Sequence, residues 1–548
     1  MPSINVLTFQ GERPTVAPRL LPNEYATAAK DCDFTENNLR PYRGSLATSE
    51  PLSAFIKSIW RYQEKYWFKF ESKTDVVQTP LDSDPWERVY FTSPNGLRVT
   101  NNTIFQGAEG RNMPAASYEL GIDINAQYDD QKAPADPIVG VVNLPTPLPS
   151  EDDPEDDETR FYTYTFLTEQ GEESAPAKES NQLEIKYPSS SVTLTIPAAP
   201  QLPGNVTKRR IYRTSTGGGI ADFYLVAELP LSQLSYTDNV SDTQLGATLS
   251  SGNYEPPSPE IQHLTLMSNG ILVGGFGNTV CFSEAYLPHA WPSEYKLTTD
   301  YEITAMAAVG SYLLVGTKGY PELFQGVSPD AMSRRKLDSV QACVSKQSML
   351  NVDGIIMYAS PQGLVAFSGN DVTVITQAVI STAQWKELKP ETIEAYYYDG
   401  KYLGFYGASK DKAFIFDHLT GSFTFLNMGS NCGYTDLVTG ELYVRSDSGV
   451  NISKWNTGDK LSFIWRSKEY YGLFPSFNTF FVRGVSLDQI GARIIADGVV
   501  IYDYKPGTLK GIPKRVPAKR GNTWQFEIYG SGEVEQVCLA TSVAEVYG

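Results

Sequence analysis

Three consecutive glycines, Gly217–Gly219, follow the basic stretch "RRIYRTS" and raise the question of whether this loop binds a phosphate. A glycine-rich loop cradles a phosphate when it joins a strand to a helix and ends in Lys-Ser or Lys-Thr. No such pair follows Gly219, and the next residues, "IADFYLVAEL", are typical of a strand. We therefore expect a hairpin loop in which glycine supplies positive φ. A solvated strand face is expected for four neighbouring residues: Lys208, Arg209, Arg210 and Arg213.

The histidines and cysteines offer little for metal or nucleophile chemistry. The three histidines, His263, His289 and His418, form no HExxH motif and no pair at zinc-ligand spacing, so we expect core or surface roles. No G-x-S-x-G elbow is present either. The five cysteines form no CxxC motif, which predicts free thiols in a reduced compartment. They are Cys32, Cys281, Cys343, Cys432 and Cys538.

Two groups of carboxylates resemble known sites without matching them. The stretch "SDSGVNISKW" (446–455) weakly resembles the Asp-box turn of sialidases. Its spacing differs from that motif, and the stretch does not recur in the other repeated segments. The acidic run Glu151–Glu158 lacks the spacing and central glycine of an EF-hand, and predicts a solvated loop. We expect no catalytic, cofactor-binding or metal-binding residues, and therefore no enzyme.

The composition predicts a globular, β-rich protein of several domains. The 548 residues exceed one ordinary core, and 41% hydrophobic with only 20% charged residues argues against disorder. The net charge of −18 argues against a general nucleic-acid-binding surface, although it is compatible with a channel wall past which DNA slides. The N-terminus has no basic start followed by an apolar run, and no 18-residue apolar run occurs, so we expect no secretory signal and no membrane span.

Five segments share one pattern, a turn containing glycine followed by an alternating apolar strand. Their glycines, Gly270, Gly310, Gly354, Gly400 and Gly440, are 40, 44, 46 and 40 residues apart. A repeat of this length with four strands is typical of a β-propeller blade. Because five blades rarely close alone and residues 55–130 supply further strand pairs, we predict an all-β protein with a propeller of six or seven blades.

The rest of the chain is divided around this repeat. Residues 1–50 include Pro14, Pro18, Pro22 and Pro41 and predict an extended arm, with one helical hint at Asn23–Lys30. Residues 51–135 are expected to form the first blades, 136–257 an inserted fibronectin-type sandwich and 258–470 the main blades. Residues 471–548 are expected to close the propeller or to form a separate small sheet. Hairpin turns are predicted at Pro94-Asn95-Gly96 and at Asp497-Gly498.

Several phrases resemble tail proteins of short-tailed bacteriophages. The first is "INVLTFQGERPTVAPRLLPNEYATAAKDCDFTENNLRPYRG", with a phenylalanine-glycine start, Leu-Leu-Pro, an alanine-rich stretch and a cysteine before "LRP". The second is "TRFYTYTFLTEQGEESAPA", followed by "RRIYRTSTGG" and "FYLVAELP". The third is "PAKRGNTWQFEIYGSGEVEQVCLATSVAEV" near the C-terminus. These phrases lie at both ends and in the middle, so the resemblance covers most of the chain.

The resemblance implies a tail nozzle or tail tubular protein built on a β-propeller. Proteins of that family form a homo-oligomeric ring, commonly of six copies, that binds an adaptor ring and surrounds the channel through which DNA leaves. It implies contacts with the tail adaptor and with tail fibres or spikes, an arm that ties neighbours together, no sequence-specific DNA binding, and a place in a virion assembled in the host cytoplasm. The residues leave two alternatives open: a receptor- or glycan-binding propeller of the same particle, and a glycan hydrolase.

Overall fold

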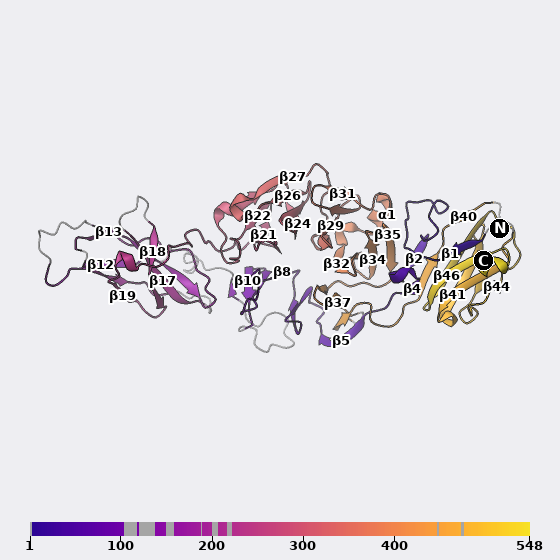
Figure 1. The fold of residues 1–548 in the computed structure, drawn as a ribbon, viewed down its shortest axis with the longest axis horizontal. Helices are drawn as coiled ribbons and strands as arrows, with labels where there is room; N and C mark the ends of the chain where they lie inside the picture. The colour runs from indigo at the N-terminus through magenta and orange to yellow at the C-terminus, as the bar shows by residue number, and fades with distance from the viewer. Residues whose placement is uncertain are drawn as a thin grey trace.

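The computed structural model describes residues 3–102, 118–119, 137–148, 158–187, 189–199, 206–215, 222–446, 449–472 and 476–547. Over these residues the chain is all-β, with two short α-helices, α1 (Thr382–Glu387) and α2 (Ala544–Tyr547). Figure 1 shows an elongated molecule with three lobes in a row. We name them the inserted lobe (residues 137–251), the middle lobe (46–102 and 118–119 with 263–454) and the C-terminal lobe (463–547 with the N-terminal strands).

Four consecutive sheet units of the middle lobe each contain four antiparallel strands hydrogen-bonded in chain order; three are separate sheets, and the fourth is one end of a ten-stranded sheet that continues into the C-terminal lobe. The strands are β20 (His263–Leu266), β21 (Leu272–Phe276), β22 (Thr279–Phe282) and β23 (Lys296–Thr298); β24 (Ile303–Val309), β25 (Tyr312–Thr317), β26 (Glu322–Gln325) and β27 (Ser333–Lys336); β28 (Leu350–Val352), β29 (Ile355–Ala359), β30 (Leu364–Phe367) and β31 (Val372–Val374); and β32 (Glu394–Tyr398), β33 (Lys401–Tyr406), β34 (Lys412–Asp417) and β35 (Ser422–Leu426).

Three further sheets complete the middle lobe, and two of them use the N-terminal part of the chain alone. One is formed by β36 (Gly433–Asp436), β37 (Glu441–Arg445) and β38 (Asn451–Lys454), with β5 (Leu46–Pro51) at its edge. The others are the pair β6 (Ser58–Tyr62) and β7 (Tyr66–Phe70), and the sheet of β8 (Val76–Gln78), β9 (Val89–Ser93), β10 (Gly96–Thr100) and β11 (Tyr118–Glu119). The hairpin predicted at Pro94-Asn95-Gly96 is confirmed by the pairing of β9 with β10.

The repeated glycines all occupy the same place in their sheets. Each lies in the turn between the first and second strand of its sheet, with φ of +77° at Gly270, +56° at Gly310, +87° at Gly354, +70° at Gly400 and +71° at Gly440. Residues with a Cβ rarely adopt this conformation. The predicted pattern of a glycine turn followed by an apolar strand is therefore confirmed in all five segments.

The first strands of the seven sheets contact one another in the order β8, β20, β24, β28, β32, β36 and β6. The N–H of Thr74, just before β8, donates to Oγ of Ser58 in β6 at 3.1 Å and so joins the two ends of this order. Apolar side chains fill the space between adjacent sheets; Leu314 of β25, for example, shares one core with Ile356 of β29. No sheet buries both of its faces by itself, so each needs its neighbours.

The inserted lobe packs two main sheets over one apolar core. Its strands are β12 (Val139–Asn143), β16 (Ser191–Thr195) and β19 (Ser235–Asp238) in one sheet, β14 (Tyr162–Thr168), β17 (Val206–Thr214) and β18 (Phe223–Pro230) in the other, and the pair β13 (Glu158–Arg160) and β15 (Leu183–Ile185). Arg88 ties this lobe to the middle lobe, because its guanidinium lies 2.8 Å from Asp84 and 2.9 Å from Glu172.

The basic strand β17 does not present a solvated arginine face, which corrects the prediction made from its sequence. Arg209 and Arg213 are fully buried, whereas Lys208 remains exposed. Arg209 lies 5.7 Å from the ring centre of Tyr164 and donates hydrogen bonds to two backbone carbonyls. Arg213 forms an ion pair of 3.1 Å with Asp238, and neither side chain is accessible to solvent. These arginines therefore belong to the core of the inserted lobe.

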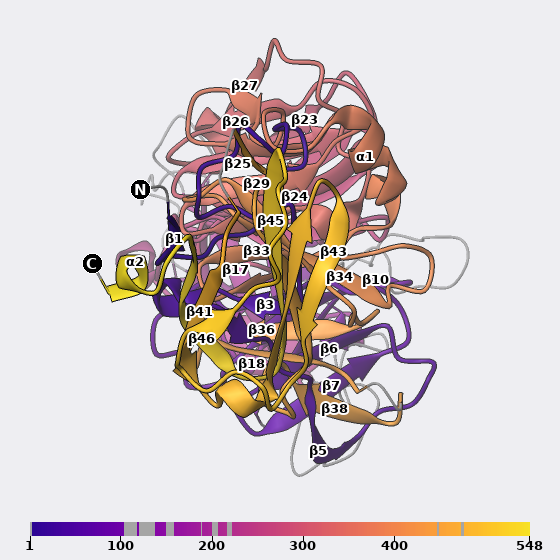
Figure 2. The ribbon, with the colours of Figure 1, turned by 90° about the vertical axis from the view of Figure 1, so that its right-hand side faces the viewer.

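The C-terminal lobe contains two sheets with one shared core of apolar side chains. One sheet consists of β1 (Ile4–Val6), β46 (Glu533–Ala540), β41 (Thr479–Val485) and β44 (Lys514–Arg515). The other contains β39 (Phe463–Arg466), β45 (Thr523–Gly530), β42 (Ile490–Ala496), β43 (Val499–Tyr504) and β40 (Tyr470–Tyr471). The hairpin predicted at Asp497-Gly498 is confirmed by the pairing of β42 with β43. Figure 2 looks onto this lobe, with β41, β46, β45 and β43 in front of the middle lobe.

The N-terminal segment joins the C-terminal and middle lobes. Strand β2 (Ala28–Lys30) pairs in parallel with β35 and antiparallel with β39, so it links a sheet of one lobe to a sheet of the other. Strand β3 (Cys32–Asp33) pairs with β4 (Arg40–Pro41). The helix suggested for Asn23–Lys30 is wrong, because residues 28–30 complete this sheet. Two open strand edges offer more hydrogen bonds than an isolated short helix.

Candidate functional site

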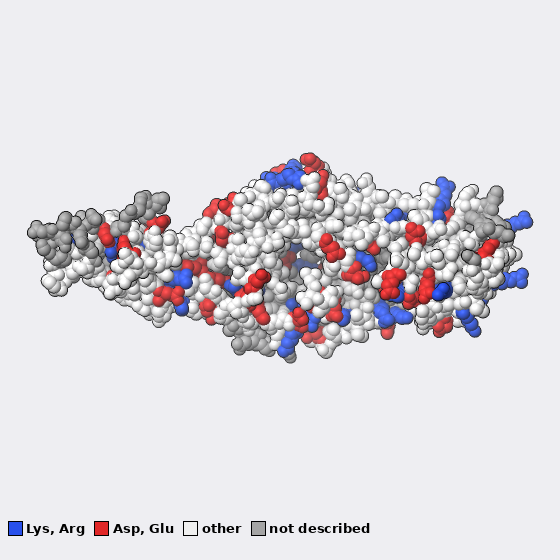
Figure 3. All heavy atoms as spheres, in the orientation of Figure 1, with Lys and Arg blue, Asp and Glu red and all other residues white. Residues whose placement is uncertain are grey.

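A cavity of about 230 Å³ lies where the first strands of the seven middle-lobe sheets converge. Each sheet contributes to its lining through a residue in, or just before, its first strand: Ser58, Asp75, His263, Met306, Met349, Glu394 and Gly433. A second cavity of about 690 Å³ shares Lys73 and Lys346 with the first. Figure 3 shows the surface hollowed in the middle of the molecule, with charged side chains inside. We name the 230 Å³ space the central cavity.

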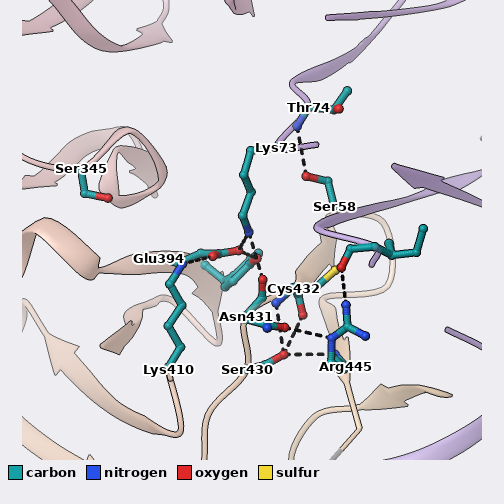
Figure 4. Close-up of polar contacts among 12 residues, drawn as sticks. Ser58, Lys73, Thr74, Ser345, Glu394, Lys410, Ser430, Asn431, Cys432 and Arg445 are labelled. Carbon is teal, nitrogen blue, oxygen red and sulfur yellow. Dashed lines mark hydrogen bonds and ion pairs between the residues drawn. The ribbon is translucent and has the colours of Figure 1, made fainter. Parts of the chain in front are cut away.

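Glu394, the first residue of β32, is the acidic centre of one charge cluster in this cavity. Its buried carboxylate lies 2.5 Å from Nζ of Lys73 and also forms an ion pair with Lys410. Tyr396 donates its hydroxyl to the same carboxylate at 2.5 Å. Figure 4 shows the two lysines reaching Glu394 from opposite sides. Burial lowers the pKa of Lys73, while the Glu394 carboxylate counteracts this shift.

Lys346 and Asp75 form a second charge pair at the cavity. Their Nζ and Oδ2 atoms are 2.8 Å apart, and Lys346 also donates to the carbonyl of Gln262 at 2.7 Å. Asp75 Oδ2 accepts a further hydrogen bond of 3.0 Å from the backbone N–H of Leu264. Lys346 belongs to a short 3₁₀ helix (Lys346–Ser348) just before β28, whereas Asp75 precedes β8. The pair therefore connects sheets that are far apart in sequence.

His263 opens β20 and lines the same cavity. Its Nδ1 atom is buried and has no hydrogen-bond partner among the described residues. Burial, assisted by the charge of Lys346, lowers the pKa of His263 to about 3. The ring is therefore neutral near pH 7, when one of its nitrogens carries a proton. Of the three histidines that the sequence offers, this is the one that the structure places in the candidate site.

Arg445, the last residue of β37, extends the positive charge around Glu394 and Lys73. Its guanidinium donates to Oδ1 of Asn431 at 2.9 Å and to the carbonyl of Ser53 at 3.0 Å. The carbonyl of Asn431 in turn accepts a hydrogen bond of 3.0 Å from Lys73. Figure 4 shows Asn431 between the two cationic side chains. In the part of the chain that the structure describes, Arg445 has no carboxylate partner among the ion pairs.

The other candidates from the sequence lie away from this cavity. Gly217–Gly219 fall outside the described residues, as do residues 151–157 of the acidic run. His289 is buried and packs edge-on against Tyr254, with ring centres 5.9 Å apart. His418 occupies the turn between β34 and β35. Across the described ranges, no group of three or more His, Cys, Asp or Glu side chains could hold a metal ion.

The stretch 446–455 ends in a residue of the core. Trp455 is buried, and its Nε1 donates to the hydroxyl of Tyr42 at 2.8 Å. Residues 447–448, which include the aspartate of the echoed Asp-box, lie outside the described residues. All five cysteines are buried and free. No helix in the described part of the chain is long and apolar enough to cross a membrane.

Sequence reasoning missed the charged residues of the central cavity. Lys73, Lys346 and Glu394 stand in three separate segments and belong to no local motif. The available signal was the repeat itself, because each repeated unit begins its first strand near one common point. Aligning the five glycine turns could have placed His263 and Glu394 at the same end of the first strand of their repeats, but it offered no reason to choose lysines from the loops.

Comparison with known proteins gives no close relative. No family model and no curated protein matches the chain. Among solved structures, an exo-beta-1,3-galactanase from Phanerochaete chrysosporium with galactose is 7% identical, covering 64% of this chain and 89% of its own, with a TM-score of 0.16. The extracellular domain of a putative one-component system from B. thetaiotaomicron is 10% identical, covering 93% and 78%, with a TM-score of 0.26. A chain of the Mitotic Checkpoint Complex is 8% identical, covering 50% and 88%, with a TM-score of 0.22. At these TM-scores the three likenesses carry no argument about activity.

Proposed function

We propose that this chain is a structural subunit of the tail of a short-tailed bacteriophage. In this proposal several copies, six in the family that it resembles, form a ring around the channel through which DNA leaves. Each copy is a seven-bladed β-propeller with an inserted sandwich and a C-terminal sandwich. The ring acts mechanically and electrostatically and performs no catalysis.

The proposed propeller is supported by the order of its first strands. Seven sheets contact one another through these strands, and all seven supply residues to one cavity. The last sheet is completed by β5 from the N-terminal part of the chain, where Ser453 pairs with Ala47. Such a strand exchange ties the first and last sheets together, which a closed ring of blades requires.

The observation that carries the tail assignment is the pairing of the two terminal phrases that resemble phage tail proteins. Ile4 of the first phrase pairs with Leu539 of the last, and Leu39 pairs with Val534. Arg40 also lies 3.0 Å from Glu533. The two terminal phrases of the resemblance therefore meet in one physical unit, the C-terminal lobe, although they are at opposite ends of the sequence.

The edge of the C-terminal lobe offers a surface for neighbouring subunits or for the adaptor. Strand β43 is the edge strand of its sheet, and its Val499 and Val500 are 57% and 49% exposed. Tyr502 on the same strand is 43% exposed. An apolar edge strand is costly in a monomer because it invites pairing with another chain. Because β43 is paired on one side only within its sheet, we assign subunit contacts to its open edge.

The charge distribution suits passage of DNA rather than tight binding. The net charge is −18, and Figure 3 shows acidic and basic side chains interspersed on one face with wide uncharged areas between them. Affinity for a nucleic acid requires clustered cations that release counterions from phosphates. An acidic ring would repel the DNA backbone and so allow it to slide.

Substitution on β43 tests the proposed assembly. Val499→Glu places a charge on the apolar edge and is expected to prevent ring formation. Native mass spectrometry should then give the mass of a monomer instead of the mass of a ring. Val327→Glu changes an 82% exposed valine of the middle lobe and serves as the matched control, which should still form the ring. If neither the natural chain nor Val327→Glu forms a ring in the presence of the adaptor, the proposal is contradicted.

The two alternatives make different predictions. A receptor- or glycan-binding propeller would bind sugars as an isolated chain on a glycan array. A glycan hydrolase needs two carboxyl groups flanking the scissile bond, and in the central cavity Asp75 and Glu394 are already ion-paired with lysines. Measurable glycosidase activity of a monomer would favour that alternative over the tail ring.

A further inference from the structure

The central cavity holds more positive than negative charge, although the protein as a whole is acidic. Three partly buried lysines, Lys73, Lys346 and Lys410, form ion pairs with only two carboxylates, Asp75 and Glu394. Lys73 and Lys346 line the cavity, and Lys410 reaches Glu394 from outside its lining. In the described residues no third carboxylate forms an ion pair with these cations. Partly buried charge without a counter-charge is unfavourable, so an excess of this kind indicates that an anion from solution completes the balance.

The lysines retain capacity to bind such an anion. An ammonium group has three N–H donors, and Lys73 uses two of them, on Glu394 and on the carbonyl of Asn431. Lys346 likewise uses two, on Asp75 and on the carbonyl of Gln262. Both lysines line the central cavity and the adjoining larger one, so they stand where a ligand from the larger cavity would arrive.

Two uncharged side chains add further polar groups to the lining. His263 lines the cavity, and its lowered pKa keeps the ring neutral near pH 7. Gln347 lines the same cavity. A cavity of about 230 Å³ is smaller than the roughly 300 Å³ at which pockets for drug-sized ligands begin. Its occupant is therefore a small ion or one small ionic group.

We propose that the central cavity binds one phosphate-class oxyanion, either inorganic phosphate or the phosphate group of a small monoester, between Lys73 and Lys346. A tetrahedral oxyanion accepts hydrogen bonds from several directions at once, which matches donors that arrive from separate sheets. The two lysines supply charge, and Gln347 and the neutral His263 ring supply hydrogen bonds. This site goes beyond the tail function and does not depend on it.

Binding of inorganic phosphate to the full chain tests this site. Titration calorimetry is expected to give one phosphate per chain at millimolar or lower concentration. Lys73→Met and Lys346→Met should each weaken binding by about tenfold or more, because each removes a charge-assisted hydrogen bond. Lys318→Met is the matched control, since Lys318 is 61% exposed and pairs with Glu302 outside the cavity.

The variants should fold, which keeps the test decisive. Without Lys73, Glu394 still has Lys410 and Tyr396 as partners, and without Lys346, Asp75 still accepts from Leu264. Circular dichroism checks that Lys73→Met and Lys346→Met fold like the natural chain. Competition by glucose 1-phosphate distinguishes inorganic phosphate from a phosphate monoester as the ligand. If glucose 1-phosphate displaces bound phosphate, the site accepts a monoester; if it does not, the site is selective for the free ion. Absence of any phosphate binding to the natural chain, or equal binding by the natural chain and both cavity variants, would overturn the proposal.

Discussion

The backbone N–H of Ala29 donates a hydrogen bond of 2.5 Å to Oε1 of Glu12. Ala29 belongs to β2, the strand that joins β35 of the middle lobe to β39 of the C-terminal lobe. Glu12 itself bridges to Phe423 of β35 through its backbone. A single carboxyl group therefore lies at the junction of the two lobes.

This carboxyl group makes stability depend on pH. Burial raises the pKa of Glu12 from 4.5 to about 7, although the Ala29 hydrogen bond and Lys30 counteract the shift. The folded chain thus binds the proton more tightly than the unfolded chain, and the free energy of unfolding falls as pH rises from about 4.5 through about 7. Glu12→Gln removes this dependence and should stabilise the protein by about 3 kcal/mol at about pH 9, with little effect at about pH 4.

Urea denaturation of the natural chain and of Glu12→Gln at both pH values measures this effect. Glu391→Gln changes an exposed glutamate and should shift the midpoint at neither pH. If the Glu12→Gln variant is less stable than the natural chain at alkaline pH, the ionised carboxylate is stabilising, contrary to this prediction.

The hydrogen bond from Trp455 to Tyr42 predicts a second, pH-independent effect. Tyr42→Phe leaves the buried indole N–H without its acceptor and should lower the free energy of unfolding by about 1–3 kcal/mol. Tyr471→Phe is the control, because Tyr471 is 69% exposed. Equal unfolding midpoints for the two variants in guanidinium chloride would mean that the N-terminal segment does not stabilise the middle lobe through this bond.

The buried ion pair of Arg213 and Asp238 predicts a large local loss. Arg213→Met leaves Asp238 buried with Tyr162 as its remaining side-chain donor and should destabilise the inserted lobe by about 3–5 kcal/mol. Lys208→Met on the same strand removes a 51% exposed partner of Glu228 and should change stability by less than about 1 kcal/mol. Limited proteolysis within residues 137–251 distinguishes the two, and similar cleavage rates would refute the assigned role of Arg213.

The glycine turns predict a backbone effect that is separate from packing. A Cβ at Gly354 would meet no atom within 4 Å, but its φ is +87°, so Gly354→Ala should lower stability by about 1–2 kcal/mol through strain alone. A Cβ at Gly252 would likewise meet no atom, and its φ is not in the left-handed region. Gly252→Ala should therefore leave the stability unchanged. If Gly354→Ala and Gly252→Ala have the same thermal unfolding midpoint, the turn at Gly354 tolerates a Cβ without strain and the prediction is wrong.

The repeated part of the fold was predictable because its signal is local. A glycine such as Gly354 marks a turn by its own φ requirement, and the alternating strand after it follows within a few residues. The hairpins at Gly96 and Gly498 were found in the same way. Each depends on neighbouring residues, which a single sequence displays directly.

The errors have long-range causes. Residues 28–30 form a strand because β35 and β39, hundreds of residues away, offer open edges. Arg213 is buried because Asp238 lies beneath it on another sheet. The charged side chains of the central cavity come from separate sheets, so no spacing in the sequence reveals that Lys73 meets Glu394.

The location of the chain in an assembled particle tests the central claim most directly. Electron cryomicroscopy of the parent particle is predicted to show several copies, six by resemblance, in a ring around the DNA exit channel at the distal end of the tail, with β43 at a contact between subunits or with the adaptor. Single copies on peripheral fibres, or the absence of the chain from the particle, would contradict the account.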